Sequence, residues 1–247
     1  MTDEAGDVYA EGSGRRVDVA LDRVEKAQRL ELLVTIKDSP WRNRWNIWVY
    51  PEVEMPQDRH LFVTADISQA LRALKKGEKV LFSPKTATVK GLEGKFLPVF
   101  WSPVHFPKQA GTMGLLCNPE HPALSDFPTD MHSDWQWWNL VKRSRVMVLD
   151  SLPPMNPIVE SVDNFVNNRR LALVFEAQVG KGRLIFSAID LLTDSQLPEI
   201  RQLRYSLTRY MLSHEFHPTT TLTPTQLRCL LQEEGTEQKT GATSIYE

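Results

Sequence analysis

Apolar and polar positions near the N-terminus alternate with the period of a β-strand. Residues 28–37 place four large aliphatic side chains on one face: Leu30, Leu32, Val34 and Ile36. This pattern predicts a strand with one apolar side. Residues 45–50 alternate in the same way, and residues 17–21 are a candidate third strand. Two or three strands cannot bury both faces of a stable sandwich. They either join the sheet of a larger domain or are the last strands of a β-sandwich whose beginning is missing, and we favour the second interpretation.

From residue 60 onward the pattern changes to alternating strands and helices. Strands are expected at residues 60–65, 79–83, 145–150, 171–179 and 184–188, and helices at residues 67–76 and 198–214. Asp66 is a good N-cap for the first helix, and Gly77 is a typical C-terminal stop. The connection between the first two strands is about the minimum crossover length, so these strands should be parallel neighbours. Gly180-Lys181-Gly182 predicts a tight β-hairpin.

These patterns divide the chain into four parts. Residues 1–15 are rich in Gly, Ser and acidic residues and are expected to be disordered. Residues 16–58 hold the β-strand segment and a linker with two prolines and three acidic residues at positions 51–58. Residues 59–216 form an α/β domain. Residues 217–247 form a short helix, capped by Thr223 with Pro224 and Gln226, and a disordered tail.

The composition is that of an ordinary globular protein and excludes several functional classes. The 29 Lys and Arg residues are balanced by 31 Asp and Glu residues, so no global basic field attracts nucleic acid or an anionic membrane. No apolar run is long enough to span a bilayer, and the acidic N-terminus has no signal-peptide pattern. Cys117 and Cys229 are too few for a disulfide framework or a four-cysteine zinc site.

An aromatic segment at residues 96–140 is the richest candidate for function. Aromatic rings beside His, Asp and Gln side chains are the chemistry of a carbohydrate site, because rings stack on sugars and polar groups bond hydroxyls. If the segment binds sugar, Trp137 and Trp138 are the expected stacking surfaces, and His132 and Asp134 the hydrogen-bonding partners. The favoured interpretation is that these aromatic side chains form a satellite core over the end of the sheet.

Other site chemistries have weaker support in the sequence. The candidate metal ligands His105, Cys117, His121 and His132 lack the close spacing of a zinc site, and no cofactor is expected. Cys117 has no flanking glycines for a nucleophile elbow, so we interpret it as an inert core thiol. Asp163 and Asp190 follow predicted strands and could present carboxylates to a ligand, but a role in fixing turns is favoured.

Several strings in this region resemble one known family. The strings are Val99-Phe100-Trp101-Ser102-Pro103-Val104-His105-Phe106-Pro107, Ser133-Asp134-Trp135-Gln136-Trp137-Trp138, Asp163-Asn164-Phe165, and Asn168-Arg169-Arg170-Leu171. Together they resemble the C-terminal region of bacterial family 2 glycoside hydrolases of the β-galactosidase type. Trp45-Asn46-Ile47-Trp48-Val49-Tyr50-Pro51 resembles the last strand of the sandwich that precedes it. The resemblance covers about residues 28–216. It implies a flavodoxin-like, glutamine-amidotransferase-like α/β module that lacks the amidotransferase cysteine, and a periplasmic or secreted location.

The catalytic part of that family has no counterpart here. Its two glutamates sit in a TIM barrel of about 250 residues, which would consume the whole chain. No Asn-Glu pair marks an acid/base residue, so no catalytic residue is carried over. We therefore expect a non-catalytic accessory module for domain packing, oligomerisation or carbohydrate binding. Its partners would be a catalytic glycoside hydrolase domain or copies of itself. The alternative is a small carbohydrate-active hydrolase that uses carboxylates or His in the aromatic segment.

Overall fold

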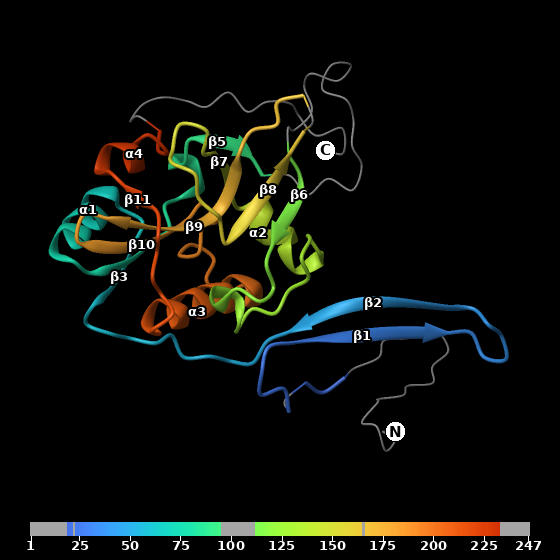
Figure 1. Ribbon diagram of the computed structural model, residues 1–247. Helices are drawn as coiled ribbons and strands as arrows, with labels where there is room; N and C mark the ends of the chain where they lie inside the picture. Colours follow the sequence, from blue (N-terminus) through green and yellow to red (C-terminus); the bar gives the residue numbers. More distant parts are fainter. Residues whose placement is uncertain (1–18, 22, 95–111, 165, 233–247) are drawn as a thin grey trace.

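The computed structural model describes residues 19–21, 23–94, 112–164 and 166–232, and shows a mixed α/β fold with a large open sheet (Figure 1). The strands are β1 Gln28–Thr35, β2 Arg42–Val49, β3 Leu61–Thr64, β4 Lys79–Phe82, β5 Gly91–Glu93, β6 Thr112–Cys117, β7 Arg145–Val148, β8 Val159–Asp163, β9 Leu171–Val179, β10 Gly182–Ser187 and β11 Thr221–Leu222. The α-helices are α1 Ile67–Lys76, α2 Trp138–Lys142, α3 Pro198–Leu212 and α4 Pro224–Arg228. Three 3₁₀ turns are η1 Thr86–Thr88, η2 Pro122–Leu124 and η3 Trp135–Trp137.

The large sheet is built around β9, its longest strand. Its main path runs β3-β4-β10-β9-β7-β5, while β8 and β11 also pair with β9, and β6 pairs with β8. Strands β3, β4 and β10 are mutually parallel, and β11 is parallel to β9. The pairs β10–β9, β7–β9, β8–β9, β6–β8 and β5–β7 are antiparallel. The sheet is therefore mixed, and the predicted α/β class is confirmed at this level.

The β3-α1-β4 unit forms as the sequence predicts, because its capping residues act locally. The Asp66 side chain accepts a hydrogen bond from the Gln69 N–H at 2.7 Å, which satisfies one of the free donors of the first turn. Gly77 ends α1 with a φ of 91°, a left-handed conformation that favours glycine. Strands β3 and β4 then pair in parallel, as expected.

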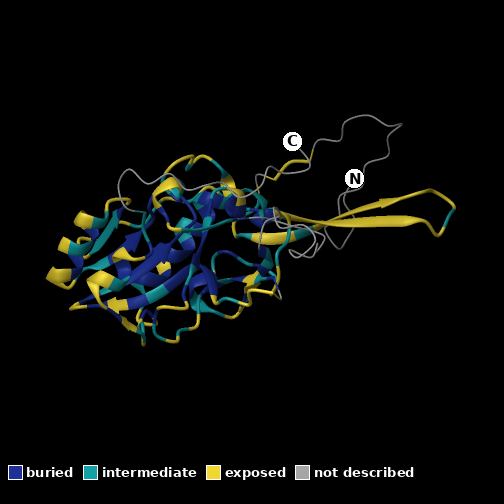
Figure 2. Ribbon diagram, turned by 90° about the horizontal axis from the view of Figure 1, so that it is seen from above, coloured by how far each residue is buried: buried dark blue, intermediate teal, exposed yellow. Residues whose placement is uncertain are grey.

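Helices cover both faces of the sheet and bury two apolar clusters (Figures 1 and 2). Leu81 of β4 belongs to the cluster that includes Leu203 of α3. Val80, the neighbouring residue on β4, belongs to the cluster of α1, β11 and α4, where Leu74 and Leu227 are buried. The segment after residue 216 is thus part of the same core. The predicted boundary at residue 216 falls too early, because Leu222 and Leu227 complete the second cluster.

Strands β1 and β2 form a separate two-stranded antiparallel sheet, which projects from the α/β body (Figures 1 and 2). The alternative in which these strands join the sheet of the larger domain is therefore wrong. Residues 19–21 are not in a strand, so the described part of the candidate strand at residues 17–21 does not form. The predicted linker at residues 51–58 contains no regular secondary structure.

The aromatic segment contains more regular structure than its sequence suggests. Its residues 96–111, including His105, lie outside the described residues, as do the predicted disordered ends at residues 1–15 and 236–247. The remainder forms β6, η2, η3 and α2. Strand β6 escapes prediction because its register with β8 shifts between Thr112 and Leu115, which breaks the alternation of buried positions.

Candidate interaction surface

The β1–β2 hairpin has one apolar and one polar face. Residues directly opposite each other in an antiparallel pair point to the same side of the sheet. The register pairs Leu30 with Ile47, Leu32 with Trp45, and Val34 with Asn43. The alternating apolar residues that the sequence predicts in each strand therefore lie on one side of the hairpin. We call this side the apolar hairpin face; it consists of Gln28, Leu30, Leu32, Val34, Asn43, Trp45, Ile47 and Val49. All the charged residues of the two strands lie on the other side: Arg29, Glu31, Arg42 and Arg44.

The outer part of the apolar hairpin face is open to solvent. Leu32, Val34, Trp45 and Ile47 are 42–50% exposed, although each is a large hydrophobic residue. Figure 2 shows most of the projecting hairpin as exposed, in contrast to the buried strands of the body. Exposed apolar patches of a few hundred Å² typically mark interaction sites. A two-stranded hairpin is also marginally stable by itself, so a covering layer on this face would stabilise it.

The strand edges of the hairpin have only part of the usual protection against further pairing. Natural edge strands usually carry Pro, Lys or a bulge that prevents further pairing. Neither β1 nor β2 contains Pro or Lys, and their register is regular from Gln28–Val49 to Thr35–Arg42. Of the usual devices against association, the hairpin has charged side chains, all on one face, and has neither a proline nor a bulge.

Polar contacts anchor the base of the hairpin to the body through its charged face. The Asp134 carboxylate accepts hydrogen bonds from Trp48 Nε1 at 3.0 Å and from the Trp135 N–H at 2.6 Å. Tyr50, just after β2, donates its hydroxyl proton to Gln136 Oε1 at 2.6 Å. Burial, with the nearby Glu199 and Asp134 carboxylates, raises the pKa of Tyr50 far above its ordinary value, so the phenol keeps this proton.

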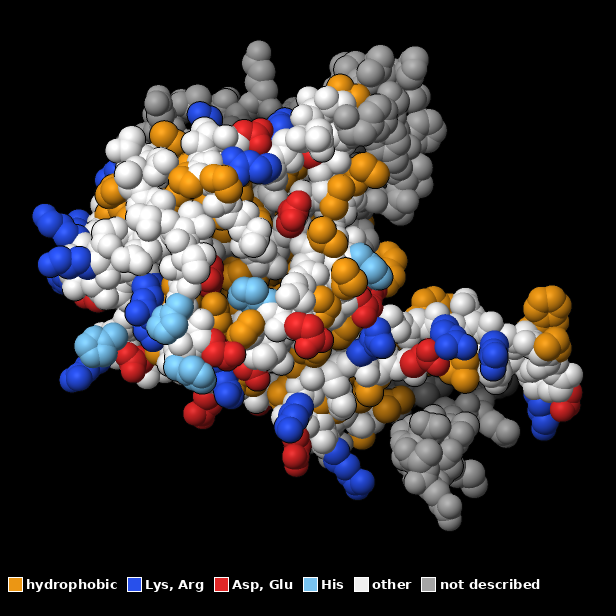
Figure 3. Space-filling model, in the orientation of Figure 1, with side chains coloured by type: hydrophobic (Ala, Val, Ile, Leu, Met, Phe, Trp, Pro, Cys, Tyr) orange, Lys and Arg blue, Asp and Glu red, His pale blue; other side chains and the backbone are white. Residues whose placement is uncertain are grey.

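An ion pair adds a second anchor at the base. Arg29 Nη1 lies 2.9 Å from Asp130 Oδ1, and its guanidinium carbon lies 6.0 Å from the centroid of the Trp48 ring. The charged face is thus turned toward the body at this point, while on the apolar hairpin face only Val49, at the base, is buried. Figure 3 shows Lys, Arg, Asp and Glu side chains along the visible side of the projecting hairpin.

The predicted carbohydrate site does not assemble as expected. Trp137 is fully buried, with its Nε1 donating to Thr129 Oγ1 at 2.8 Å and its ring 5.2 Å from that of Phe127. A buried ring offers no face to a sugar, so the assignment of Trp137 as a stacking surface is wrong. Trp137 instead belongs to the main apolar cluster. For this residue and Phe127, the interpretation of the segment as core is confirmed.

The other predicted site residues are only partly available. Asp134 holds the hairpin, as described above, and caps η3. Trp138 is half-buried, with Lys142 Nζ 4.6 Å from its ring centroid and Trp135 5.7 Å away. His132 is exposed, and its Nδ1 lies 3.2 Å from the Ser133 carbonyl oxygen. Trp135 was not predicted as a site residue. It is 64% exposed, which makes it the most exposed of the three tryptophans at positions 135, 137 and 138.

A pocket of about 460 Å³ lies beside β6 and β8. Leu116 and Met131 contribute apolar surface, while Glu160 and Arg170 contribute charge. None of its lining residues is aromatic, so it lacks the stacking surface expected for a sugar. Arg170 Nη2 is already bound to the Leu149 carbonyl oxygen at 2.6 Å. The sequence gives no signal for this pocket because its lining residues come from five separate segments.

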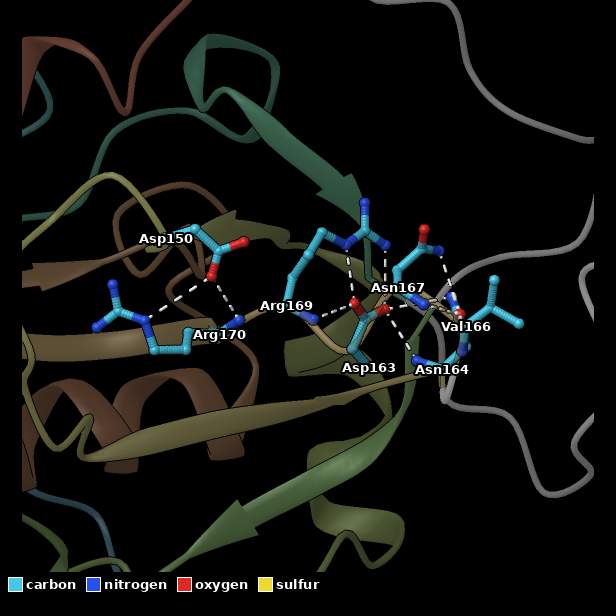
Figure 4. A network of polar contacts seen from close by, with 7 residues as sticks. All are labelled: Asp150, Asp163, Asn164, Val166, Asn167, Arg169 and Arg170. Carbon is cyan, nitrogen blue, oxygen red and sulfur yellow. Dashed lines mark hydrogen bonds and ion pairs between the residues drawn. The ribbon is translucent and has the colours of Figure 1, made fainter.

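Asp163 is a structural residue, as the favoured interpretation states (Figure 4). Its side chain is 2% exposed and accepts hydrogen bonds from Arg169 Nε at 2.8 Å, Arg169 Nη2 at 3.0 Å, and the Asn164 N–H at 2.8 Å. Burial alone would raise the pKa of Asp163, but these hydrogen bonds and the Arg169 charge hold it below its ordinary value. The carboxylate thus closes the turn between β8 and β9.

Asp190 is likewise engaged in a turn. Its Oδ1 accepts hydrogen bonds from the Leu192 N–H at 3.1 Å and the Thr193 N–H at 2.9 Å. Cys117 is buried, and burial raises the pKa of its thiol to about 11. This thiol is therefore almost entirely protonated at neutral pH, which fits the core role assigned to it.

Glu176 and Tyr210 form a polar pair under α3. The Tyr210 hydroxyl donates to Glu176 Oε2 at 2.8 Å, and the His121 ring lies 5.5 Å from that of Tyr210. Burial raises the pKa of Glu176 and lowers that of His121. The Glu176–Tyr210 pair joins β9 to α3. His121 Nδ1 also accepts a hydrogen bond from the Ala123 N–H, so all three side chains have a structural role.

Within the described ranges, no group of three or more His, Cys, Asp and Glu side chains is placed so that it could hold a metal ion. The same ranges include no helix with the length and apolar character needed to cross a membrane.

Two family models match the chain, and they divide it at the linker. The model for a domain of unknown function, DUF8487, matches residues 62–232, which begin at the second residue of β3 and extend beyond α4. The chain belongs to the DUF8487 family. A second model, for the domain of unknown function DUF8488, matches residues 1–51, which include β1 and β2. No curated protein matches the chain. The DUF8487 region is thus the α/β body, and the hairpin lies in a separately matched unit.

Proposed function

We propose that this chain is a non-catalytic accessory module that serves a larger carbohydrate-active enzyme by protein–protein docking. The observation that carries the proposal is the uncovered apolar hairpin face, where Leu32, Val34, Trp45 and Ile47 remain 42–50% exposed. The hairpin has the composition of one layer of a β-sandwich, with an apolar side and a polar side. In this proposal the other layer of the sandwich comes from another polypeptide chain.

The enzyme context rests on the resemblance to family 2 glycoside hydrolases of the β-galactosidase type. In that context the body would be a flavodoxin-like, glutamine-amidotransferase-like module. The parallel β3-α1-β4 unit and the parallel pair β4–β10 support this assignment. The antiparallel strands β9, β7 and β5 would then extend such a core on one side.

The positions of the carboxylates favour docking over catalysis. Asp134, Asp163 and Asp190 all accept hydrogen bonds from backbone N–H groups that fix turns or caps. A glycosidase needs two carboxyl groups facing a common space at the sugar. Docking is also favoured over carbohydrate binding, because Trp137 is buried and the Asp134 carboxylate already accepts a hydrogen bond from Trp48 Nε1.

The proposal is tested by assaying turnover and association on the same purified chain. Chromogenic galactosides, glucosides and esters should not be hydrolysed. Size-exclusion chromatography with light scattering should show the chain in a complex, alone or with an added family 2 barrel enzyme, and Leu32→Arg should reduce that complex. A strictly monomeric chain under both conditions, with turnover that disappears in His132→Ala or Asp134→Asn, would favour the small-hydrolase alternative.

A further inference from the structure

The composition and accessibility of the apolar hairpin face indicate what kind of partner covers it. We propose that its occupant is the same face of a second copy of this chain, packed about a two-fold axis to make a four-stranded sandwich. The inference rests on the proposed function and deepens it by naming the partner. It is supported by the absence of charge on the face, by its exposed apolar residues and by its accessibility.

Charge on the face is compatible with self-pairing. A two-fold interface brings each side chain near residues of the same surface patch, so charged groups there would meet like charges. The apolar hairpin face contains no ionisable residue between Gln28 and Val49, and its only polar side chains there are Gln28 and Asn43. Arg29, Arg42 and Arg44 all lie on the opposite face, where they do not enter the contact.

The apolar hairpin face is extended beyond the two strands by residues near the turn. Ile36 and Trp41 continue the alternation toward the turn and are 64% and 70% exposed. They extend the patch formed by the side chains of the two strands. A specific, stable interface removes at least about 1,200 Å² from water in total, so each copy would contribute about 600 Å², comparable to the largest apolar patch on a typical monomer.

The geometry leaves the face accessible to another copy. The hairpin projects from the body in both views (Figures 1 and 2), and eight residues per strand make it about 27 Å long. Its anchors to the body, Trp48 and Arg29, are on the charged side. Two hairpins can therefore stack at the usual sheet separation of about 10 Å while each body stays on the outer, charged side.

Two adjacent leucines provide a matched test. Leu32 and Leu33 are 47% and 49% exposed and lie on opposite faces of β1. Leu32→Arg would place a charge inside the proposed interface, where burial without a partner is costly, whereas Leu33→Arg adds the same charge on the outer face. Ile47→Arg is a second variant on the apolar face. Circular dichroism should show that all three variants keep the folded body.

Sedimentation equilibrium of the full chain decides the proposal. We expect a dimer whose dissociation constant rises at least about tenfold in Leu32→Arg and Ile47→Arg and is nearly unchanged in Leu33→Arg. A wild-type chain that stays monomeric up to high concentration overturns the inference. If that monomer still forms a complex with an added family 2 barrel enzyme, the proposed function stands while the second copy is excluded as occupant. A dimer that tolerates Leu32→Arg as well as Leu33→Arg also overturns the inference, because it uses another surface.

Discussion

At the scale of single residues, polar side chains in this protein mostly hold the backbone in place. Asp163 illustrates the point, because one nearly buried carboxylate accepts hydrogen bonds from the Arg169 side chain and from two backbone N–H groups. Arg169 is the partner that makes this burial tolerable. Removing either residue leaves the charge of the other without its partner. The pair should therefore contribute more to stability than an exposed ion pair such as Arg44–Glu31.

The first prediction concerns Asp163→Asn. At pH 7 this variant should lose about 1–3 kcal/mol of unfolding free energy, because it removes the charged acceptor from a partly buried network of hydrogen bonds. The folded-state pKa of Asp163 is depressed, so its contribution is present above the unfolded pKa of about 3.9 and is lost as pH falls through the folded value. Urea unfolding at several pH values measures this difference. Arg44→Ala is the exposed control and should cost less than about 1 kcal/mol.

The second prediction concerns the two thiols. Cys117 is buried, with a thiol pKa of about 11, whereas Cys229 is exposed. In native protein at pH 8, a disulfide reagent should label one thiol rapidly, and Cys229→Ser should abolish that rapid phase because thiolate and access are both needed. Rapid labelling that persists in Cys229→Ser would contradict the buried environment of Cys117.

At the scale of elements, close backbone packing fixes α1 against the sheet. A Cβ atom at Gly182, at the start of β10, would lie 2.7 Å from Leu74 Cα in α1 and 2.8 Å from the Glu78 carbonyl oxygen. Real Cβ atoms essentially never approach backbone this closely. Glycine is therefore required here for packing, in addition to any role in the β9–β10 turn.

The third prediction follows from this contact. Gly182→Ala should destabilise the protein by about 1–3 kcal/mol through overpacking, seen as a lower midpoint in urea or thermal unfolding. Gly114→Ala, in β6, is the matched control, since its Cβ would meet only Ser133 Oγ at 3.2 Å. Equal effects of the two substitutions would show that α1 does not pack against β10 as described.

The elements that the sequence predicts are those specified by local chemistry. Helix α1 is determined by Asp66 and Gly77, and the β9–β10 hairpin by alternation around Gly180. Strands β5, β6 and β8 are missed, because they are short or irregular and form only through pairing with distant segments. The apolar side of the β1–β2 hairpin is predicted from apolar residues that recur at every second position. Its exposure cannot be predicted in this way, because it depends on where the hairpin lies relative to the rest of the protein. Likewise, consecutive Trp137 and Trp138 differ in burial because of the local geometry of η3, which composition does not encode.

At the scale of the whole molecule, the protein consists of a well-packed body and a hairpin with little burial of its own. The body buries two clusters on either side of the large sheet. The hairpin is held at its base by Asp134, Gln136 and Asp130, while its outer part remains exposed. The two units should therefore differ in local stability, since opening free energies follow the number of buried apolar contacts.

The fourth prediction concerns the junction between these units. Tyr50→Phe removes the hydroxyl that donates to Gln136 Oε1, so it should cost about 1 kcal/mol or more by leaving a buried acceptor without its donor. Trp48→Phe removes the indole donor to Asp134 and should loosen the hairpin with little effect on the body. Limited proteolysis should then cleave the chain faster within residues 51–58 in both variants than in wild type.

Hydrogen–deuterium exchange of β1 and β2 tests the central claim, that the apolar hairpin face is a docking surface, most directly. The account predicts rapid exchange in dilute protein, because an uncovered two-stranded sheet is marginally stable. It predicts strong protection in the assembled state, lost in Leu32→Arg, kept in Leu33→Arg and accompanied by little change in β9 and β10. Exchange in β1 and β2 that is the same in dilute protein, in concentrated protein and in the presence of a family 2 barrel enzyme would contradict it.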